Sequence, residues 1–546
     1  MAACILAALA VRVPFWSERA PRVRDGSTLV LRLSGPIAER APSRIPLLES
    51  GSAWTTLELW EVLRKAAKDK RIAALLFLPE QPGAGWAKLS EIRAGIVAFR
   101  AAGKPVTAYL RTPSARDYYL ASASSRIVAA HGGYFNVKGL RAELLYARGT
   151  LDKLGIAAEF ESLGRYKDGA DILTRTEMSA TTREVMNGLL DARFEEWTGA
   201  IAAGRGKSKE EVRRLIDEGP FLAADAVKAG LADGVQFESE AKADLARLLR
   251  QDALREVDAW SYRLIPAKEF FAEKDGRIAF LVAEGDITSS PLPAMGGAQL
   301  DPEEFARVVK EIREDSSIQA VVLRMNSPGG DATVSEQMLH EVKLLAAKKP
   351  VVVSMSDVAA SAGYQIALGG HVLCADPATI TGSIGVFFGK LSLAGLYGKV
   401  GVNKQILTRG RHAAIDSDAT PISVEERVKL RAMLERFYAD FVTQVAAARG
   451  RRAEEIEPLA QGRIWLGAEA KRNGLIDELG GIGRAMELAA ARAKLSAYQV
   501  VVYPKPGAVE AVRERMRFLR WAASLPLKSE TAPGFWSRLP FEVSVD

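Results

Sequence analysis

Four short stretches in the first half of the chain recur in the second half, in the same order and at nearly one spacing. GKPVTAYL at 103–110 resembles KKPVVVSM at 348–355, so that Pro105 and Pro350 lie 245 residues apart. The other pairs are LSEI with VSEQ, LGRY with RGRH, and GLAD with GLID, at offsets of 244 to 246 residues. Because self-similarity at a fixed offset is typical of a duplicated unit, the sequence predicts two copies of one domain.

The repeat sets the expected domain boundaries. The first copy is predicted at 28–236 and the second at 276–500, and the charged stretch at 237–275 is interpreted as a helical linker. Residues 1–27 remain as an N-terminal segment and residues 501–546 as a C-terminal tail. At roughly 150 residues per domain, a chain of 546 residues allows two to four domains, which includes this arrangement.

Each copy has the same order of expected elements. An apolar strand, TLVLRL in the first copy and RIAFLVAEG in the second, precedes a helix with apolar residues at helical spacing. A second strand, a glycine-rich turn, a helix and a third strand follow, and long amphipathic helices complete the copy. Strands that alternate with helices predict an α/β fold with mainly parallel sheets and flanking helices.

Charge and cysteine content exclude some function classes. The net charge is +7, but the basic residues are spread along the chain, which argues against nucleic acid as a partner and fits an anionic membrane surface better. The two cysteines, Cys4 and Cys374, belong to no CxxC motif or Cys/His cluster. The sequence therefore predicts no structural zinc.

Both ends of the chain contain apolar stretches. Ala2–Val11 is an apolar run of ten residues, whereas a membrane-spanning helix needs roughly 20, and no cationic region precedes it as in a signal peptide. It is interpreted either as the end of a longer membrane segment or as an unstructured terminus. VRERMRFLRWAASL at 512–525 alternates arginines with apolar residues, which is typical of a packed terminal helix or of a helix on a membrane surface. Packing is the favoured interpretation.

Two turns in the second copy suggest catalytic chemistry. In MNSPGGD at 325–331, glycines at the start of an expected helix leave backbone N–H groups free, which makes the Gly330 N–H a candidate oxyanion donor. In VAASAGY, Ser361 begins the helix after the next strand, where a serine is either an N-cap or a nucleophile at the carboxyl edge of the sheet. Each turn alone fits ordinary structure, but the pair is far more specific.

A nucleophilic serine also needs a base. The histidines lie in no recognisable triad context; they are His131, His340, His371 and His412. A neutral lysine is the alternative, and it requires burial because the ordinary lysine pKa is about 10.4. Lys167, in ESLGRYKDGADILT, stands among small and apolar residues and is a candidate base, although an ordinary surface lysine fits the same pattern.

These motifs together resemble a known family. NSPGG, AASAGY, TITGSIGV and GRYKDGAD, with QGRIWLGAEAKRNGLIDELGG, are similar to the long form of signal peptide peptidase A over about residues 28–500. The resemblance implies a serine peptidase with a Ser-Lys dyad and two tandem domains of the Clp-protease/crotonase-like fold. It further implies that Ser361 is the nucleophile, Lys167 the general base, Gly330 the oxyanion donor, and Ser383 the residue that hydrogen-bonds the lysine amine.

The resemblance also implies substrates, partners and location. The substrates would be extended apolar peptides such as signal-peptide remnants, and neither a metal nor an organic cofactor would be needed. The chain would form a homo-oligomer, expected to be a tetramer that encloses its sites in a ring or bowl. It would be membrane-associated, with the bulk of the chain on the periplasmic, extracytoplasmic face of a bacterial inner membrane.

The repeat supports a site shared between the copies. At an offset of 245 residues Arg116 stands opposite Ser361, and at 246 Ala413 stands opposite Lys167, so that each copy has one half of the dyad. One departure from the family pattern is Asp168, at a position where serine is common. A carboxylate beside the lysine raises the lysine pKa, but adjacent side chains diverge, so Asp168 is expected to point away.

Two other function classes remain open from the sequence. A crotonase-like acyl-thioester enzyme also uses glycine N–H groups as an oxyanion hole, but it needs neither Ser361 nor Lys167 and requires a nucleotide-binding site, for which no motif is present. A catalytically degenerate, membrane-associated scaffold is the alternative that is not an enzyme. Covalent labelling by a serine-directed probe distinguishes the peptidase from both.

Overall fold

The structure is a computed structural model that describes residues 20–41, 53–271, 276–288, 298–505 and 534–538. The apolar run at the N-terminus and the arginine-rich stretch in the C-terminal tail therefore lie outside the described residues. In the part that is described, no helix combines the length and the apolar character that a bilayer span requires.

The first domain is built on a parallel sheet with the strand order β10-β1-β3-β4-β5-β9. The strand bounds are β1 (Ser27–Ala38), β3 (Ile72–Gly83), β4 (Val106–Leu110), β5 (Arg126–Ala130), β9 (Gly234–Gln236) and β10 (Glu256–Asp258). Consecutive residues of β3 such as Leu76 and Phe77 are both fully buried. Burial on both faces is expected for a parallel sheet that is covered by helices on each side, here α2 (Thr56–Lys68) and α3 (Trp86–Ala101) on one face and α10 (Glu238–Leu248) on the other.

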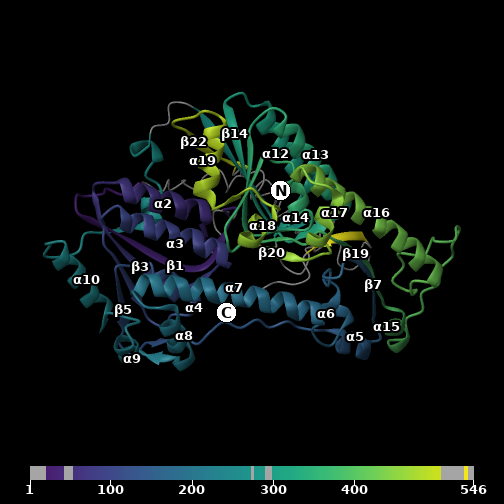
Figure 1. The fold of residues 1–546 in the computed structure, drawn as a ribbon, viewed down its shortest axis with the longest axis horizontal. Helices are drawn as coiled ribbons and strands as arrows, with labels where there is room; N and C mark the ends of the chain where they lie inside the picture. The colour runs from purple at the N-terminus through teal and green to yellow at the C-terminus, as the bar shows by residue number, and fades with distance from the viewer. Residues whose placement is uncertain (1–19, 42–52, 272–275, 289–297, 506–533, 539–546) are drawn as a thin grey trace, which may run out of the picture.

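The second domain repeats this order as β22-β11-β14-β16-β17-β21, again with parallel pairing. The strand bounds are β11 (Arg277–Glu284), β14 (Ile318–Ser327), β16 (Val351–Ala360), β17 (Val372–Ala375), β21 (Glu478–Leu479) and β22 (Gln499–Tyr503). The predicted fold class of tandem α/β domains with mainly parallel sheets is confirmed. In Figure 1 the first domain, in purple to teal, lies at the lower left and the second at the upper right.

The duplication extends to individual hydrogen bonds. The buried hydroxyl of Tyr118 donates to the carbonyl of Leu231 at 2.7 Å, and the buried hydroxyl of Tyr364 donates to that of Leu475 at the same distance. A buried phenol hydroxyl needs a hydrogen-bond acceptor, and both copies supply it with the equivalent backbone carbonyl.

The stretch at 237–275, interpreted from the sequence as a helical linker, contributes core elements to the first domain. Its helix α10 (Glu238–Leu248) and strand β10 correspond to α19 (Ile482–Arg492) and β22 of the second copy, at the same offset of about 245 residues. The matching motifs end earlier, at GLAD and GLID, so this part of the repeat left no clear sequence signal. We propose domain boundaries near 27–258 and 277–503 on this basis.

A buried cluster of charges joins the two domains. Arg324 of β14 is fully buried and forms ion pairs with Glu39 at 2.9 Å and with Glu91 at 2.8 Å, both from the first domain. Asp357, in β16, accepts a hydrogen bond from the backbone N–H of Gly85 at the start of α3, at 3.0 Å. Removing one member of such a cluster would leave a buried charge unpaired, so substitution of these residues is expected to destabilise the contact between the domains.

Candidate active site

A ladder between the two domains brings the candidate base to the candidate nucleophile. β7 (Ala157–Leu163) of the first copy pairs antiparallel with β19 (Val386–Ser392) of the second, with the end of β7 opposite the start of β19 (Figure 1). Lys167 follows the end of β7 by four residues, and Ser383 precedes the start of β19 by three. The ladder therefore delivers both residues to the same place.

Ser361 occupies the N-cap position of helix α14 (Ala362–Ala367), directly after β16. Its side chain makes no capping hydrogen bond, its φ is 55°, and it is fully buried. Its backbone N–H donates to the carbonyl of Gly382 at 2.8 Å, which holds this conformation. A positive φ in a residue other than glycine costs free energy and is concentrated at functional sites. The structure thus contradicts the alternative that Ser361 is an ordinary helix cap.

Lys167 is buried, and its amine lies within hydrogen-bond distance of two serines. Nζ is 2.7 Å from Ser361 Oγ, 3.1 Å from Ser383 Oγ and 3.1 Å from the Ser383 carbonyl oxygen. A neutral amine has one lone pair and two N–H groups. This geometry lets it accept the proton of Ser361 while it donates to both oxygens of Ser383.

The surroundings of Lys167 favour the neutral amine. Burial lowers the pKa of Lys167 to about 7, and the neighbouring carboxylate of Asp168 opposes this change. At its ordinary pKa of about 10.4, a lysine would be neutral in only about one molecule in 2,500 at pH 7. Burial therefore makes the neutral amine much more accessible near neutral pH than it is for an exposed lysine.

Ser383 is held in place by a second strained turn. Its φ is 52°, it is fully buried, and its backbone N–H donates to the carbonyl of Arg463 at 2.8 Å. The structure therefore places three of the four residues selected from the sequence in direct contact.

The fourth residue, Gly330, lies in the short strand β15 (Gly329–Asp331). This strand pairs with Ile287 of β12 (Asp286–Ile287) on one side and, on the other, with β23 (Gly534–Arg538) from the C-terminal end. A Cβ at Gly330 would collide with the Ile287 backbone, and its φ is 158°, so only glycine fits. The sequence pattern suggested an open turn at this point, whereas the structure has an extended segment paired on both sides. Asp331 caps the following helix α13 (Ala332–Ala346), as expected.

Sequence reasoning assigned no role to the residues that fix the lysine loop. Gln461 accepts the backbone N–H of Tyr166 at 2.8 Å through its carbonyl, and that of Arg165 at 3.1 Å through Oε1. Gly462 packs so closely that an added Cβ would lie 2.6 Å from the Cβ of Lys167. These residues belong to the QGRIW motif, whose glycine was the available signal.

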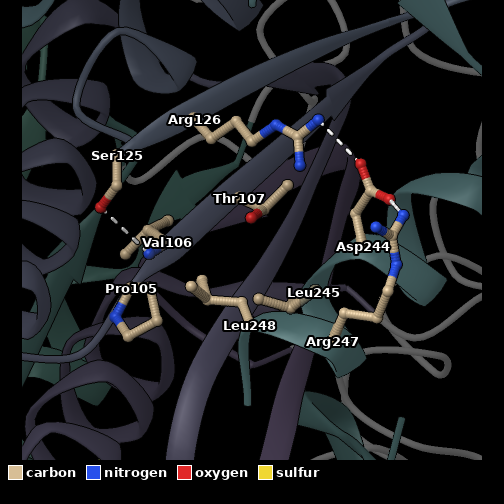
Figure 2. A pocket seen from close by; sticks show the side chains of 9 residues that line it. All are labelled: Pro105, Val106, Thr107, Ser125, Arg126, Asp244, Leu245, Arg247 and Leu248. Atoms are coloured by element: carbon tan, nitrogen blue, oxygen red, sulfur yellow. Dashed lines mark hydrogen bonds and ion pairs between the residues drawn. The ribbon is translucent and has the colours of Figure 1, made fainter. Parts of the chain in front are cut away.

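A surface pocket of about 380 Å³ lies elsewhere on the first domain, between β4 and α10 (Figure 2). It is lined by Pro105, Val106, Thr107, Ser125, Arg126, Asp244, Leu245, Arg247 and Leu248. None of these is a residue of the site, and an ion pair of 2.9 Å between Arg126 and Asp244 crosses its wall. Among the described residues, no group of three or more His, Cys, Asp and Glu side chains is placed to hold a metal ion.

Comparison with known proteins relates the chain to proteases. The model of peptidase family S49 matches residues 98–252 and 343–496, once in each copy. The chain is 33% identical over 481 residues to the chloroplastic serine protease SPPA of Arabidopsis thaliana, covering 87% of this chain and 70% of that protein. It is 30% identical over 471 residues to protease 4 of Salmonella typhi, covering 84% and 75%. Protease 4 of Haemophilus influenzae is 30% identical over 454 residues, covering 80% and 72%.

Proposed function

The chain belongs to peptidase family S49, and from this premise we propose that it hydrolyses peptide bonds with a Ser-Lys dyad made of Ser361 and Lys167. Its resemblance to the long form of signal peptide peptidase A is confirmed by relatives of that kind, and it is a serine peptidase. The observation that carries the dyad is the 2.7 Å contact between a buried lysine of one copy and a strained, buried serine of the other.

The proposed reaction follows from this contact. Neutral Lys167 takes the proton from Ser361 Oγ as the oxygen attacks the peptide carbonyl. The Gly330 N–H stabilises the tetrahedral oxyanion, and the lysine then gives its proton to the leaving amine. Water, deprotonated by the same lysine, releases the acyl group. Ser383 orients the amine throughout, as the third member of a triad orients its base.

The two other function classes lack a comparable observation. A crotonase-like acyl-thioester enzyme or an inactive scaffold gives no reason to bury a lysine amine against a serine oxygen. Such a scaffold would also gain nothing from a positive φ at Ser361, which costs of order 1–3 kcal/mol.

The dyad is tested by activity on a fluorogenic apolar peptide and by labelling with a serine-reactive probe. Ser361→Ala and Lys167→Ala are both expected to lose activity and labelling to background, by roughly 10⁴-fold or more. Circular dichroism melts of the variants check that they remain folded. Full activity of Ser361→Ala would contradict the dyad, and an inert, unlabelled wild-type protein would favour the scaffold.

We propose that substrates bind as extended peptides alongside β15, next to Gly330. β23 lies between β15 and β19 and runs antiparallel to both, with Ser537 opposite Gly330. Recognition by strand addition uses such edges, because main-chain hydrogen bonds bind any sequence that extends. This supports extended peptides as the substrate class, and the family resemblance is what points to apolar ones such as signal-peptide remnants.

In this proposal β23 occupies the strand edges of β15 and β19 that the substrate would use, so the two compete. Removing residues 534–546 is expected to lower KM and leave kcat unchanged, since the dyad keeps its contacts. An unchanged KM would mean that peptides bind elsewhere.

Self-association is proposed from the way in which the copies contact each other inside the chain. Helix α7 (Ala180–Arg205) of the first copy crosses the lower half of the molecule in Figure 1 and contacts the second domain. Its residues Met186 and Leu189 bury Ile464 and Leu466 of the second copy. Because the domains are duplicated, each of these two surfaces has a counterpart in the other copy.

These repeated surfaces are uncovered. Leu222, the counterpart of Leu466, is 66% exposed, and Met433 of α16 (Val424–Arg449), the counterpart of Leu189, is 38% exposed. The counterpart of β7 at 403–409 forms no strand, and its Leu407 is 96% exposed. A second copy of the chain that repeats the internal contact head to tail would cover all three, and such heterologous contacts close into rings. This supports a homo-oligomer, and the number of four subunits is proposed from the family resemblance alone.

The association is tested by light scattering. Leu407→Glu and Leu222→Asp are expected to give a smaller particle than wild type. Leu248→Asp is the matched control, because this leucine is 64% exposed but lies on α10, outside the proposed contact. Equal particle sizes for all four proteins would contradict the contact.

We also propose that the protein associates with the periplasmic face of a bacterial inner membrane. The net charge of +7 and the apolar substrate class support this location. Sedimentation with anionic vesicles is expected to exceed that with neutral vesicles and to fall with salt. Equal recovery with both would contradict the electrostatic contribution.

A further inference from the structure

Asp168 follows the candidate base directly, yet its side chain leads to a different element. Its carboxylate accepts a hydrogen bond from the hydroxyl of Thr182, in the first turn of α7. Thr182 is buried, and its backbone N–H is bonded to the cap residue Ser179 at 3.0 Å. The carboxylate of the residue next to Lys167 is therefore fixed to α7, while Ser361 and Ser383 keep their places at the lysine amine.

The neighbouring charges are largely occupied with one another. The charged and titratable groups around this loop are Tyr146, Asp171, Arg175, Arg183, Glu184 and Arg463. Arg175 lies 3.7 Å from Asp171, and Arg463 lies 2.9 Å from Glu184. Asp168 thus faces a cation in Lys167 and a second acid in Asp171.

Asp168 and Lys167 each shift the pKa of the other, and each of these shifts opposes the effect of burial. Burial raises the pKa of Asp168 overall, and the Thr182 hydroxyl and the Lys167 ammonium limit that rise. Burial lowers the pKa of Lys167, and Asp168 raises it. A base whose pKa falls far below the working pH is a weak base, so a fixed carboxylate beside a fully buried lysine has chemical value.

We propose that Asp168 is a positioning residue that sets the pH at which Lys167 gives up its proton, and that Thr182 keeps it ionised for this task. The inference rests on the proposed dyad, since it concerns the protonation of the base. It differs from a structural role because the effect acts through charge: Asn at this position keeps an acceptor for Thr182 and removes only the charge.

The test is the pH profile of kcat/KM between pH 5 and 9, with the rate of Ser361 labelling as a second readout. In Asp168→Asn the acid limb is expected to move to lower pH by about one unit, so that activity at pH 6 relative to pH 8 rises several-fold. Asp171→Asn is the matched control, because it removes a carboxylate three residues away that does not act on the lysine. Its acid limb is expected not to move to lower pH.

Thr182 gives an independent variant. Thr182→Val is expected to move the limb in the same direction by a smaller amount, and Thr182→Ser is expected to restore the wild-type profile. A uniform loss of kcat/KM in Asp168→Asn with an unmoved limb would overturn the inference and leave the dyad intact. Activity retained in Lys167→Ala would instead overturn the dyad itself, which separates the two failures.

Discussion

Two serines begin equivalent helices in the two copies, and they do different things. Ser114 precedes α4 (Ala115–Ala121) with φ −74°; its hydroxyl accepts the backbone N–H of Asp117, and the Asp117 carboxylate accepts the Ser114 backbone N–H in return. Ser361 precedes α14 with φ 55° and caps nothing. The difference shows that the fold supplies a serine position at the sheet edge, and that a backbone change turns a cap into a candidate nucleophile.

The comparison also corrects the alignment of the repeat at this point. An offset of 245 residues placed Arg116 opposite Ser361, whereas the helix starts place Ser114 there, at an offset of 247. The reason is that β16 is longer than β4, so the second copy has extra residues before its helix. The first copy therefore keeps a serine at this position but uses it as a cap.

The segment that carries the lysine also differs between the two copies. In the first copy the strand β7 is ordered by pairing with β19, and Lys167 follows it into the interior. In the second copy the corresponding residues 403–409 form no strand and are exposed. Each copy thus contributes what the other lacks, and the site depends on the arrangement of the two domains.

The largest expected effect comes from breaking that arrangement. Arg324→Ala removes the guanidinium that pairs with buried Glu39 and Glu91 and leaves Glu39 with the weaker ion pair to Lys88 at 3.7 Å. It is expected to lower the free energy of unfolding by about 3–5 kcal/mol, with loss of activity. Chemical denaturation measures it. The control is Arg484→Ala, which removes an exposed pair with Glu478 within the second copy and should cost at most about 1 kcal/mol. Equal losses of stability in the two variants would mean that the buried cluster between the domains is no more important for stability than an exposed ion pair.

The next effect acts on the loop that carries the lysine. Gly462→Ala places a methyl group against Lys167 at a residue with φ 74°, so the amine is displaced from Ser361. A misplacement of about 1 Å costs roughly 10²-fold in rate, and the loss is expected mainly in kcat. Steady-state kinetics measure it. Gly206→Ala, at an open helix end with a similar φ of 64°, is the control for backbone strain alone.

A smaller effect follows from the pKa of the base. Because burial brings the pKa of Lys167 to about 7, the amine is protonated below that pH and has no lone pair for the Ser361 proton. Log kcat/KM is expected to fall with unit slope below about pH 7, which is tenfold per pH unit. A flat profile down to pH 5 would exclude Lys167 as the base.

The sequence predicted the architecture better than it predicted the contacts. Duplication, parallel sheets and the helix starts at Asp331 and Ser361 follow from short local patterns, whereas the open turn expected at Gly330 is a paired strand in the structure. The ladder between β7 and β19 joins residues more than 200 positions apart, and no periodicity indicates such a partner. The role of Gln461 was hidden for the same reason, since a carbonyl that holds a loop of the other domain leaves no mark on its own segment. The positive φ of Ser361 could not be predicted either, because serine has no general preference for this backbone conformation.

The smallest expected effect returns to the two serines. Ser114→Ala removes an N-cap hydrogen bond and leaves the Asp117 side chain without the Ser114 hydroxyl, so it should cost about 1 kcal/mol in stability, measured by thermal unfolding. Its activity is expected to stay at the wild-type level, because Ser114 is not among the residues that contact Lys167 or Ser361. Ser361→Ala is expected to show the reverse, with lost activity and no loss of capping, because the Ser361 side chain makes no capping hydrogen bond. If instead both substitutions lowered stability by the same amount and spared activity, the two serines would be equivalent caps, and the distinction between the copies would rest on the lysine loop alone.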